Sequence, residues 1–130
     1  MDAQDMGDAL ERILVTEDEL SRRMRELAAQ IDADYQGKEL LLVGVLKGAL
    51  MVMADLSRNL HTPLAMDWMA VSSYGTGTKS SGVVRILKDL DADVHGRDVL
   101  IVEDIIDSGL TLSWLRENLL SRGAASVEIA

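Results

Sequence analysis

The sequence contains no cysteine, a single proline and few aromatic residues, namely two tryptophans, two tyrosines and no phenylalanine. Without cysteine, neither a disulfide framework nor a thiolate metal site is possible. The remaining composition is that of a folded domain rather than a disordered chain, since 48% of the residues are hydrophobic and 27% are charged. With 130 residues, the chain fits one domain over residues 1–130 that buries a sizeable core.

Positive charge is also scarce. The chain has 13 Lys and Arg against 22 Asp and Glu, a net charge of −9, which argues against nonspecific binding of nucleic acid. The longest apolar runs have the length of strands, well short of the roughly 20 residues that a membrane helix needs, and the acidic N-terminus lacks the pattern of a signal peptide. We therefore expect a cytoplasmic protein with no nucleic-acid or membrane partner.

Hydrophobic periodicity predicts alternating strands and helices after an irregular segment at residues 1–12. Helices are expected at about 17–34, 49–60 and 111–122, and strands at about 40–45, 64–72, 83–87 and 98–102, with another strand beginning at residue 126. This alternation predicts a mainly parallel sheet with helices on both faces. The strands at 64–72 and 83–90 have an alternative arrangement, an antiparallel ribbon whose glycine-rich connection forms a mobile flap.

Three acids and two hydroxyls gather after the buried strand 98–102. Glu103 and Asp104 stand where this strand ends, and the turn Asp107-Ser-Gly-Leu-Thr111 leads into the next helix. Ligands of parallel sheets lie at the carboxyl ends of strands, and the first turn of a helix offers N–H groups to phosphate. The pattern therefore predicts a site for a phosphorylated sugar. Its ribose hydroxyls would bind the acidic pair, and a nearby hydrated Mg2+ would offset the negative charge.

This turn has other interpretations. The acids are alternatively a solvated helix cap, or the acidic site of a phosphorelay receiver domain, although the receiver pair follows the first strand and this pair follows a late one. A Walker loop is excluded because no Gly-Lys-Ser/Thr sequence follows Gly44 and Gly48. A dinucleotide fingerprint is excluded because Ser80 stands at the position of its third glycine.

Two further stretches bear on the same site. Lys47 and Gly48 end the strand at 40–45, where they are either a surface lysine with a helix-entry glycine or a cation and a close backbone approach for a second phosphate group. Tyr74 lies in the polar, glycine-rich stretch 72–82. It is either an ordinary loop aromatic or part of a lid that excludes water from a reactive sugar carbon.

The stretch Val99–Leu112 resembles the phosphoribosyl-pyrophosphate (PRPP) signature of the type I phosphoribosyltransferases. Three others, Leu40–Ala49, Val71–Gly75 with its following loop, and Arg85–Leu90, are similar to bacterial hypoxanthine-guanine phosphoribosyltransferases. The match covers about residues 12–130. It implies the α/β fold of that family, a mainly parallel sheet flanked by helices with a flexible antiparallel flap.

The resemblance implies a purine salvage enzyme that moves a 5-phosphoribosyl group from PRPP to N9 of hypoxanthine or guanine, giving IMP or GMP and pyrophosphate with Mg2+ as cofactor. Asp107 would accept a proton near purine N7, Glu103 and Asp104 would hold the ribose hydroxyls and the metal-bound substrate, and Lys47 and Gly48 would bind pyrophosphate after an unusual cis Leu46–Lys47 peptide. The implied nucleotide-binding residues are Glu103, Asp104, Ile105, Ile106, Asp107, Ser108, Gly109, Leu110 and Thr111, and the implied closing-loop residues are Ser73 and Tyr74.

The resemblance covers only part of the length of the family members. Family members continue past the last matching motif with residues that grip the purine, and this sequence ends at Ala130. We therefore expect a C-terminally incomplete chain in which most of the base-binding hood is missing and the purine preference is not encoded. The alternative function is a non-catalytic PRPP- or nucleotide-binding regulatory module on the same fold. A homo-oligomer, either a dimer or a tetramer, is expected from the family.

Overall fold

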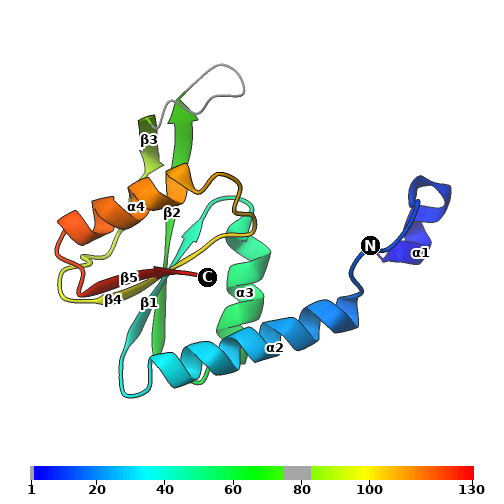
Figure 1. Ribbon diagram of the computed structural model, residues 1–130, viewed down its shortest axis with the longest axis horizontal. Helices are drawn as coiled ribbons and strands as arrows, with labels where there is room; N and C mark the ends of the chain where they lie inside the picture. Colours follow the sequence, from blue (N-terminus) through cyan, green and yellow to red (C-terminus); the bar gives the residue numbers. More distant parts are fainter. Residues whose placement is uncertain (1, 75–82) are drawn as a thin grey trace.

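The computed structural model describes residues 2–74 and 83–130 of the chain (Figure 1). Its elements are α1 (Ala3–Met6), the 3-10 turn η1 (Gly7–Ala9), α2 (Glu17–Asp34), β1 (Leu40–Val45), α3 (Ala49–Asn59), β2 (Leu64–Tyr74), β3 (Val83–Lys88), β4 (Asp98–Val102), α4 (Leu110–Ser121) and β5 (Ser126–Ile129). The predicted order of helices and strands is confirmed. Within the described residues, no helix has both the length and the apolar character needed to cross a membrane.

The five strands form one sheet in the order β3-β2-β1-β4-β5. The pairs β1–β2, β1–β4 and β4–β5 are parallel, and β3 runs antiparallel to β2. The first part of β2, Leu64–Met69, pairs with β1, while Ala70–Tyr74 pairs with β3. The antiparallel ribbon is thereby confirmed, and Figure 1 shows it projecting from the body of the sheet. The expected flap at its tip, residues 75–82, lies outside the described residues.

Helices cover both faces of the sheet because alternate residues of the central strands point to opposite sides. Val43 and Ile101 pack with α4 on one face, and Leu42 and Leu100 pack with α2 and α3 on the other. Figure 1 shows this division, with α4 on one side of the strands and α2 and α3 on the other. The strands β1 and β4 are therefore the rigid centre of the molecule, and the segments that follow them are held on a fixed base.

The N-terminal region differs in part from its prediction. Residues 1–12 were expected to be irregular, but Asp2 and Asp5 form a reciprocal capping box that starts the short helix α1. The helix α2 also begins with a capping box. Thr16 Oγ1 accepts from the backbone N–H of Glu19 at 3.1 Å, and the Glu19 carboxylate accepts from that of Thr16 at the same distance.

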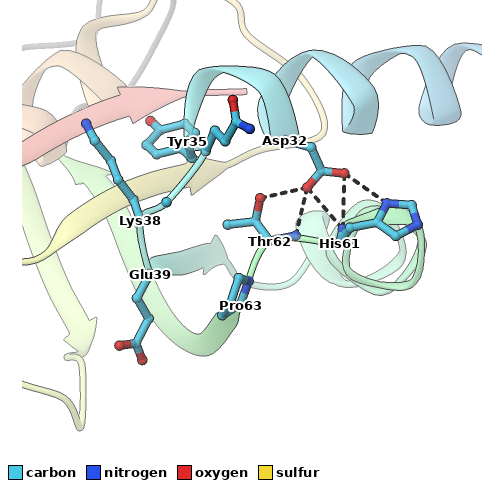
Figure 2. Close-up of a pocket in the computed structure, with 9 residues that line it drawn as sticks. Asp32, Tyr35, Lys38, Glu39, His61, Thr62 and Pro63 are labelled. Carbon is cyan, nitrogen blue, oxygen red and sulfur yellow. Dashed lines mark hydrogen bonds and ion pairs between the residues drawn. The ribbon is translucent and has the colours of Figure 1, made fainter.

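One carboxylate fastens the end of α2 to the turn before β2. Asp32 accepts hydrogen bonds from the backbone N–H groups of His61 at 3.0 Å and Thr62 at 2.8 Å, and from the Thr62 hydroxyl at 2.7 Å. Figure 2 shows these bonds converging on the carboxylate. Desolvation tends to raise the pKa of Asp32, but the hydrogen bonds from Thr62 and His61 prevail and lower it to about 2.

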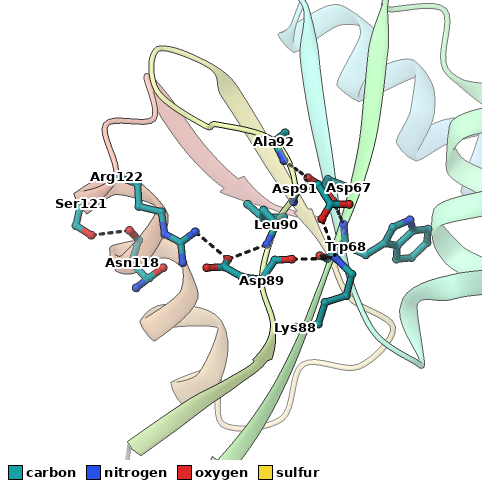
Figure 3. Close-up of polar contacts among 10 residues, drawn as sticks. All are labelled: Asp67, Trp68, Lys88, Asp89, Leu90, Asp91, Ala92, Asn118, Ser121 and Arg122. Carbon is teal, nitrogen blue, oxygen red and sulfur yellow. Dashed lines mark hydrogen bonds and ion pairs between the residues drawn. The ribbon is translucent and has the colours of Figure 1, made fainter.

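A second carboxylate is buried within the sheet. Asp67 of β2 is only 6% exposed; it accepts from the backbone N–H groups of Asp91 and Ala92 at 3.0 and 2.8 Å in the connection from β3 to β4. Asp67 is buried because this connection folds back over the strand (Figure 3). An ion pair of 2.8 Å between Arg122 and Asp89 ties the end of α4 to the same connection.

Candidate active site

The candidate site lies where β1 and β4 end. These two strands are parallel neighbours, with Gly44 opposite Val102, so the segments that follow them emerge at the same edge of the sheet. A Cβ atom built on Gly48 would lie 2.7 Å from Cγ of Asp104. The turn after β1 and the acidic pair after β4, which are more than 50 residues apart in the sequence, therefore share one wall of the site.

The acidic pair combines a half-buried and an exposed carboxylate. The backbone N–H of Glu103 donates to the carbonyl of Ala130 at 3.2 Å, and its carboxylate accepts from the backbone N–H of Asp104 at 3.0 Å. Burial, together with a hydrogen bond shared with the Asp104 carboxyl, raises the pKa of Glu103 to about 7. Ionisation of Glu103 beside Asp104 is therefore unfavourable. A bound cation would offset the cost of the second negative charge.

The turn from Asp107 to Thr111 presents backbone N–H groups at the start of α4. Asp107 accepts from the backbone N–H of Ser108 at 2.6 Å, and Gly109 has a left-handed conformation with φ of 75°, which favours glycine. Gly109, the N-cap residue of α4, has no side chain to cap the helix, and the only side-chain bond to its first turn among the described residues is a long one of 3.5 Å from the backbone N–H of Leu110 to the Ser108 hydroxyl. An added Cβ at Gly109 would meet no atom within 4 Å. The loop therefore leaves room for an anion at the helix start, as phosphate binding requires.

A pocket of about 300 Å³ lies between these segments. It is lined by Val45, Leu46, Val71, Glu103, Ile105, Asp107, Gly109, Thr111 and Leu112. The structure thereby gathers several of the implied nucleotide-binding residues around one hollow, with side chains from β1, β2 and α4 closing its walls. Ile106, Ser108 and Leu110 belong to the same segment, are exposed or nearly so, and do not line this hollow.

The remaining implied residues are not among the described residues that line this pocket. Lys47 is exposed at the end of β1, and the peptide that joins it to Leu46 is cis, as the resemblance implied. Ser73 and Tyr74 end β2, where their backbones pair with Val84 and Val83, so they belong to the ribbon rather than to a free loop. The rest of the closing loop lies outside the described residues.

The chain is similar to known proteins over most of its length. A model of the phosphoribosyl transferase domain matches residues 14–130. The hypoxanthine-guanine phosphoribosyltransferase of Bacillus subtilis (strain 168) is 53% identical over 120 residues, which cover 92% of this chain and 67% of the relative. The chain belongs to the hypoxanthine-guanine phosphoribosyltransferase family.

Other members agree in sequence and in structure. The hypoxanthine-guanine phosphoribosyltransferase of Mycobacterium tuberculosis (strain ATCC 25618 / H37Rv) is 53% identical over 126 residues. The match covers 92% of this chain, which spans only 62% of that relative's length. A crystal structure of hypoxanthine phosphoribosyltransferase from Staphylococcus aureus matches with a TM-score of 0.91 and 46% identity, covering 97% of this chain and 68% of that one. The phosphoribosyltransferase fold predicted from the sequence is thus confirmed.

Two contacts in this phosphoribosyltransferase core were not predicted from the sequence. The contact between Gly48 and Asp104 joins the segments that follow β1 and β4, and only the strand order reveals that they meet. The hydrogen bond from Glu103 to Ala130 likewise depends on β5 lying beside β4. Both contacts follow from the order of the strands in the sheet, which the sequence pattern did not assign.

Proposed function

We propose that this chain carries the PRPP-binding core of a purine salvage phosphoribosyltransferase. The reaction transfers a 5-phosphoribosyl group to N9 of hypoxanthine or guanine and gives IMP or GMP with release of pyrophosphate. The observation that carries the proposal is the contact of Gly48 with Asp104, beside a pocket that Leu46 and the Glu103–Thr111 segment line, in a chain of this family. One segment suits the leaving group and the other suits the phosphorylated ribose.

Each part of the site has a role in this chemistry. The bond from C1′ to pyrophosphate breaks as the bond to N9 forms, and positive charge develops on the ribose. Backbone N–H groups at the start of α4 and the hydroxyls of Ser108 and Thr111 would hold the 5′-phosphate. The carboxylate of Asp107 lines the pocket and would accept the proton that the purine loses near N7. Lys47 and Gly48 would bind the departing pyrophosphate.

Mg2+ fits the residues that are present. Glu103 and Asp104 supply adjacent carboxylate oxygens, and Mg2+ in proteins is commonly held by one or two carboxylates together with substrate phosphates and water. Within residues 2–74 and 83–130, no group of three or more His, Cys, Asp or Glu forms a site for a metal by itself. Glu103 and Asp104 would hold the ion together with the substrate phosphates, and the ion would offset the negative charge of the leaving pyrophosphate.

Family membership supports two wider proposals. We propose that the protein acts in the cytoplasm and forms a homo-oligomer, a dimer or a tetramer. One structural neighbour is the hypoxanthine phosphoribosyl transferase of Trypanosoma cruzi, with 42% identity and a TM-score of 0.85. Its structure addresses the role of the C-terminal region in the oligomeric state and enzymatic activity of that enzyme. Light scattering of the full-length protein, coupled to size exclusion, tests the assembly.

The test of the proposed function is release of pyrophosphate from PRPP by the full-length protein. Release is expected with hypoxanthine or guanine and with Mg2+, and chelation of the metal should abolish it. Replacement of Asp107 by Asn should lower kcat by roughly 10²- to 10⁴-fold, the usual contribution of a general base, and leave PRPP binding in calorimetry largely intact. The matched control is Asp55→Asn, an exposed acid on α3 that pairs with Arg58.

The outcomes separate the alternatives. Binding of PRPP without any turnover would support the regulatory module instead of the enzyme. A large loss of PRPP affinity in Asp107→Asn, with kcat preserved, would make Asp107 part of the phosphate loop rather than the proton acceptor.

A further inference from the structure

The contact between Gly48 and Asp104 is tighter than any side chain at residue 48 allows. A Cβ on Gly48 would lie 2.7 Å from both Cγ and Oδ1 of Asp104, well inside the distance of van der Waals contact. The Asp104 carboxylate therefore occupies the space that a side chain at residue 48 would fill. The backbone before α3 forms the wall against which this carboxylate rests.

The backbone conformation of Gly48 does not itself require glycine. Its φ of −58° and ψ of −39° are those of a right-handed helix, which alanine adopts readily. Gly109 differs, because its φ of 75° belongs to the left-handed region where other residues are strained. The reason for glycine at position 48 is thus space rather than conformation, and the neighbour that uses this space is an acid of the candidate site.

The exposure of Asp104 determines what a larger residue would change. Its side chain is exposed and short, so a methyl group at residue 48 would turn the carboxylate away from the wall without disturbing the core. The fold would lose little, since the added methyl meets no buried side chain among its three nearest atoms. The direction of the Asp104 carboxylate, in contrast, would change.

We propose that Gly48 is a positioning residue that fixes the direction of the Asp104 carboxylate. The inference rests on the proposed function and adds a role for Gly48 beyond contact with pyrophosphate. In this arrangement the turn after β1 sets the position of the acid that receives the ribose hydroxyls and the metal-bound substrate. The pyrophosphate and the ribose hydroxyls of PRPP are therefore recognised by residues in direct contact, and a change in one residue alters the other.

The test is Gly48→Ala in the full-length protein. The KM for PRPP should rise roughly tenfold, as expected when one hydrogen bond to a charged group is lost, while kcat changes less. The midpoint of thermal unfolding should stay within about 2 °C of the unmodified protein, which separates repositioning from unfolding. Asp55→Ala, which removes an exposed acid of α3 away from residue 48, is the matched control and should leave KM unchanged.

A double-mutant cycle assigns the effect to Asp104. Asp104→Ala should raise KM for PRPP by itself, and adding Gly48→Ala to it should cause no further increase, because the displaced carboxylate is already gone. An equal increase in both backgrounds would overturn the inference, as would an unchanged KM in Gly48→Ala. If the unmodified full-length protein released no pyrophosphate from PRPP, the proposed function would fail first, and the positioning role would fall with it.

Discussion

Replacing Asp32 with alanine tests how the end of α2 is fastened to the body of the domain. The carboxylate accepts two hydrogen bonds from Thr62 and one from the backbone of His61, at 2.7 to 3.0 Å. All of them would be lost in Asp32→Ala, and α2 would separate from the turn that leads into β2. The His61 ring also contacts the carboxylate at 3.1 Å, but its side chain is 92% exposed, so this ion pair contributes little.

The expected loss of stability is about 2–3 kcal/mol. A hydrogen bond to a charged group contributes about 1.5–3 kcal/mol, but the Asp32 side chain is 21% exposed and the freed N–H groups gain access to water. The total loss of free energy is therefore smaller than the sum expected for three fully buried hydrogen bonds. In a domain of this size the loss corresponds to a decrease of about 8–12 °C in Tm.

The same carboxylate should make stability depend on pH. Its folded pKa of about 2 lies below the ordinary value of 3.8, so the folded state binds the proton less readily than the unfolded state. The contribution of Asp32 is complete above the unfolded pKa and is lost as the pH falls toward the folded pKa. The difference in stability between the original protein and Asp32→Ala should therefore narrow by roughly half at pH 3.

Urea unfolding at pH 7, 5 and 3 measures these differences. His61→Ala is the matched control, because it keeps the backbone donor and removes only the exposed ring; it should cost less than about 0.5 kcal/mol. A loss below about 1 kcal/mol in Asp32→Ala at pH 7, or a loss that stays constant down to pH 3, would refute the role of the ionised carboxylate.

Two further predictions concern residues at the edges of the site. Gly44→Ala should destabilise the fold by about 1–3 kcal/mol in urea unfolding, because its Cβ would lie 2.6 Å from the Trp68 ring; an unchanged midpoint would show that the ring moves freely. Glu103→Gln should raise Tm by about 4 °C at pH 8 without Mg2+, a value reduced for the solvent exposure of this group. The folded pKa of Glu103, about 7, exceeds its ordinary 4.5, so stability falls as pH rises between these values, and the two proteins should have equal Tm below pH 4.5. A gap that persists there would point to packing instead.

Local signals predicted the elements of this fold because each is encoded within one stretch of chain. Thr16 and Glu19 form the capping box at the start of α2, a motif four residues long. The structure contains both of its hydrogen bonds. The aliphatic runs at 40–45 and 98–102 predicted strands, the second of them buried, and four of the five residues of β4 are buried. Such features depend on neighbours in sequence, which a single sequence displays.

Contacts between distant segments were not predictable in the same way. The burial of Asp67 depends on the connection at Asp91 and Ala92, which folds back onto β2. An isolated acid in an alternating strand has the pattern of a solvent-facing position, and nothing local reveals that three backbone N–H groups surround it. The burial of such an acid depends on how the strands and their connections are arranged. The sequence pattern left the strand β3 either in the parallel sheet or in an antiparallel ribbon with β2.

The charges of the candidate site explain why its local motifs point to a ligand that brings its own cation. The described residues that line the pocket include the carboxylates of Glu103 and Asp107 and no Lys or Arg, and the chain as a whole has a net charge of −9. A polyanion approaching this surface meets repulsion that backbone N–H groups offset only locally, since the helix dipole contributes about 0.3–1 kcal/mol at an exposed site. The half-buried Glu103, whose pKa is already raised, would gain the most from a divalent ion beside it. If the proposed function holds, the same acids that would oppose free PRPP would therefore favour its complex with Mg2+, and the site would select the metal-bound form.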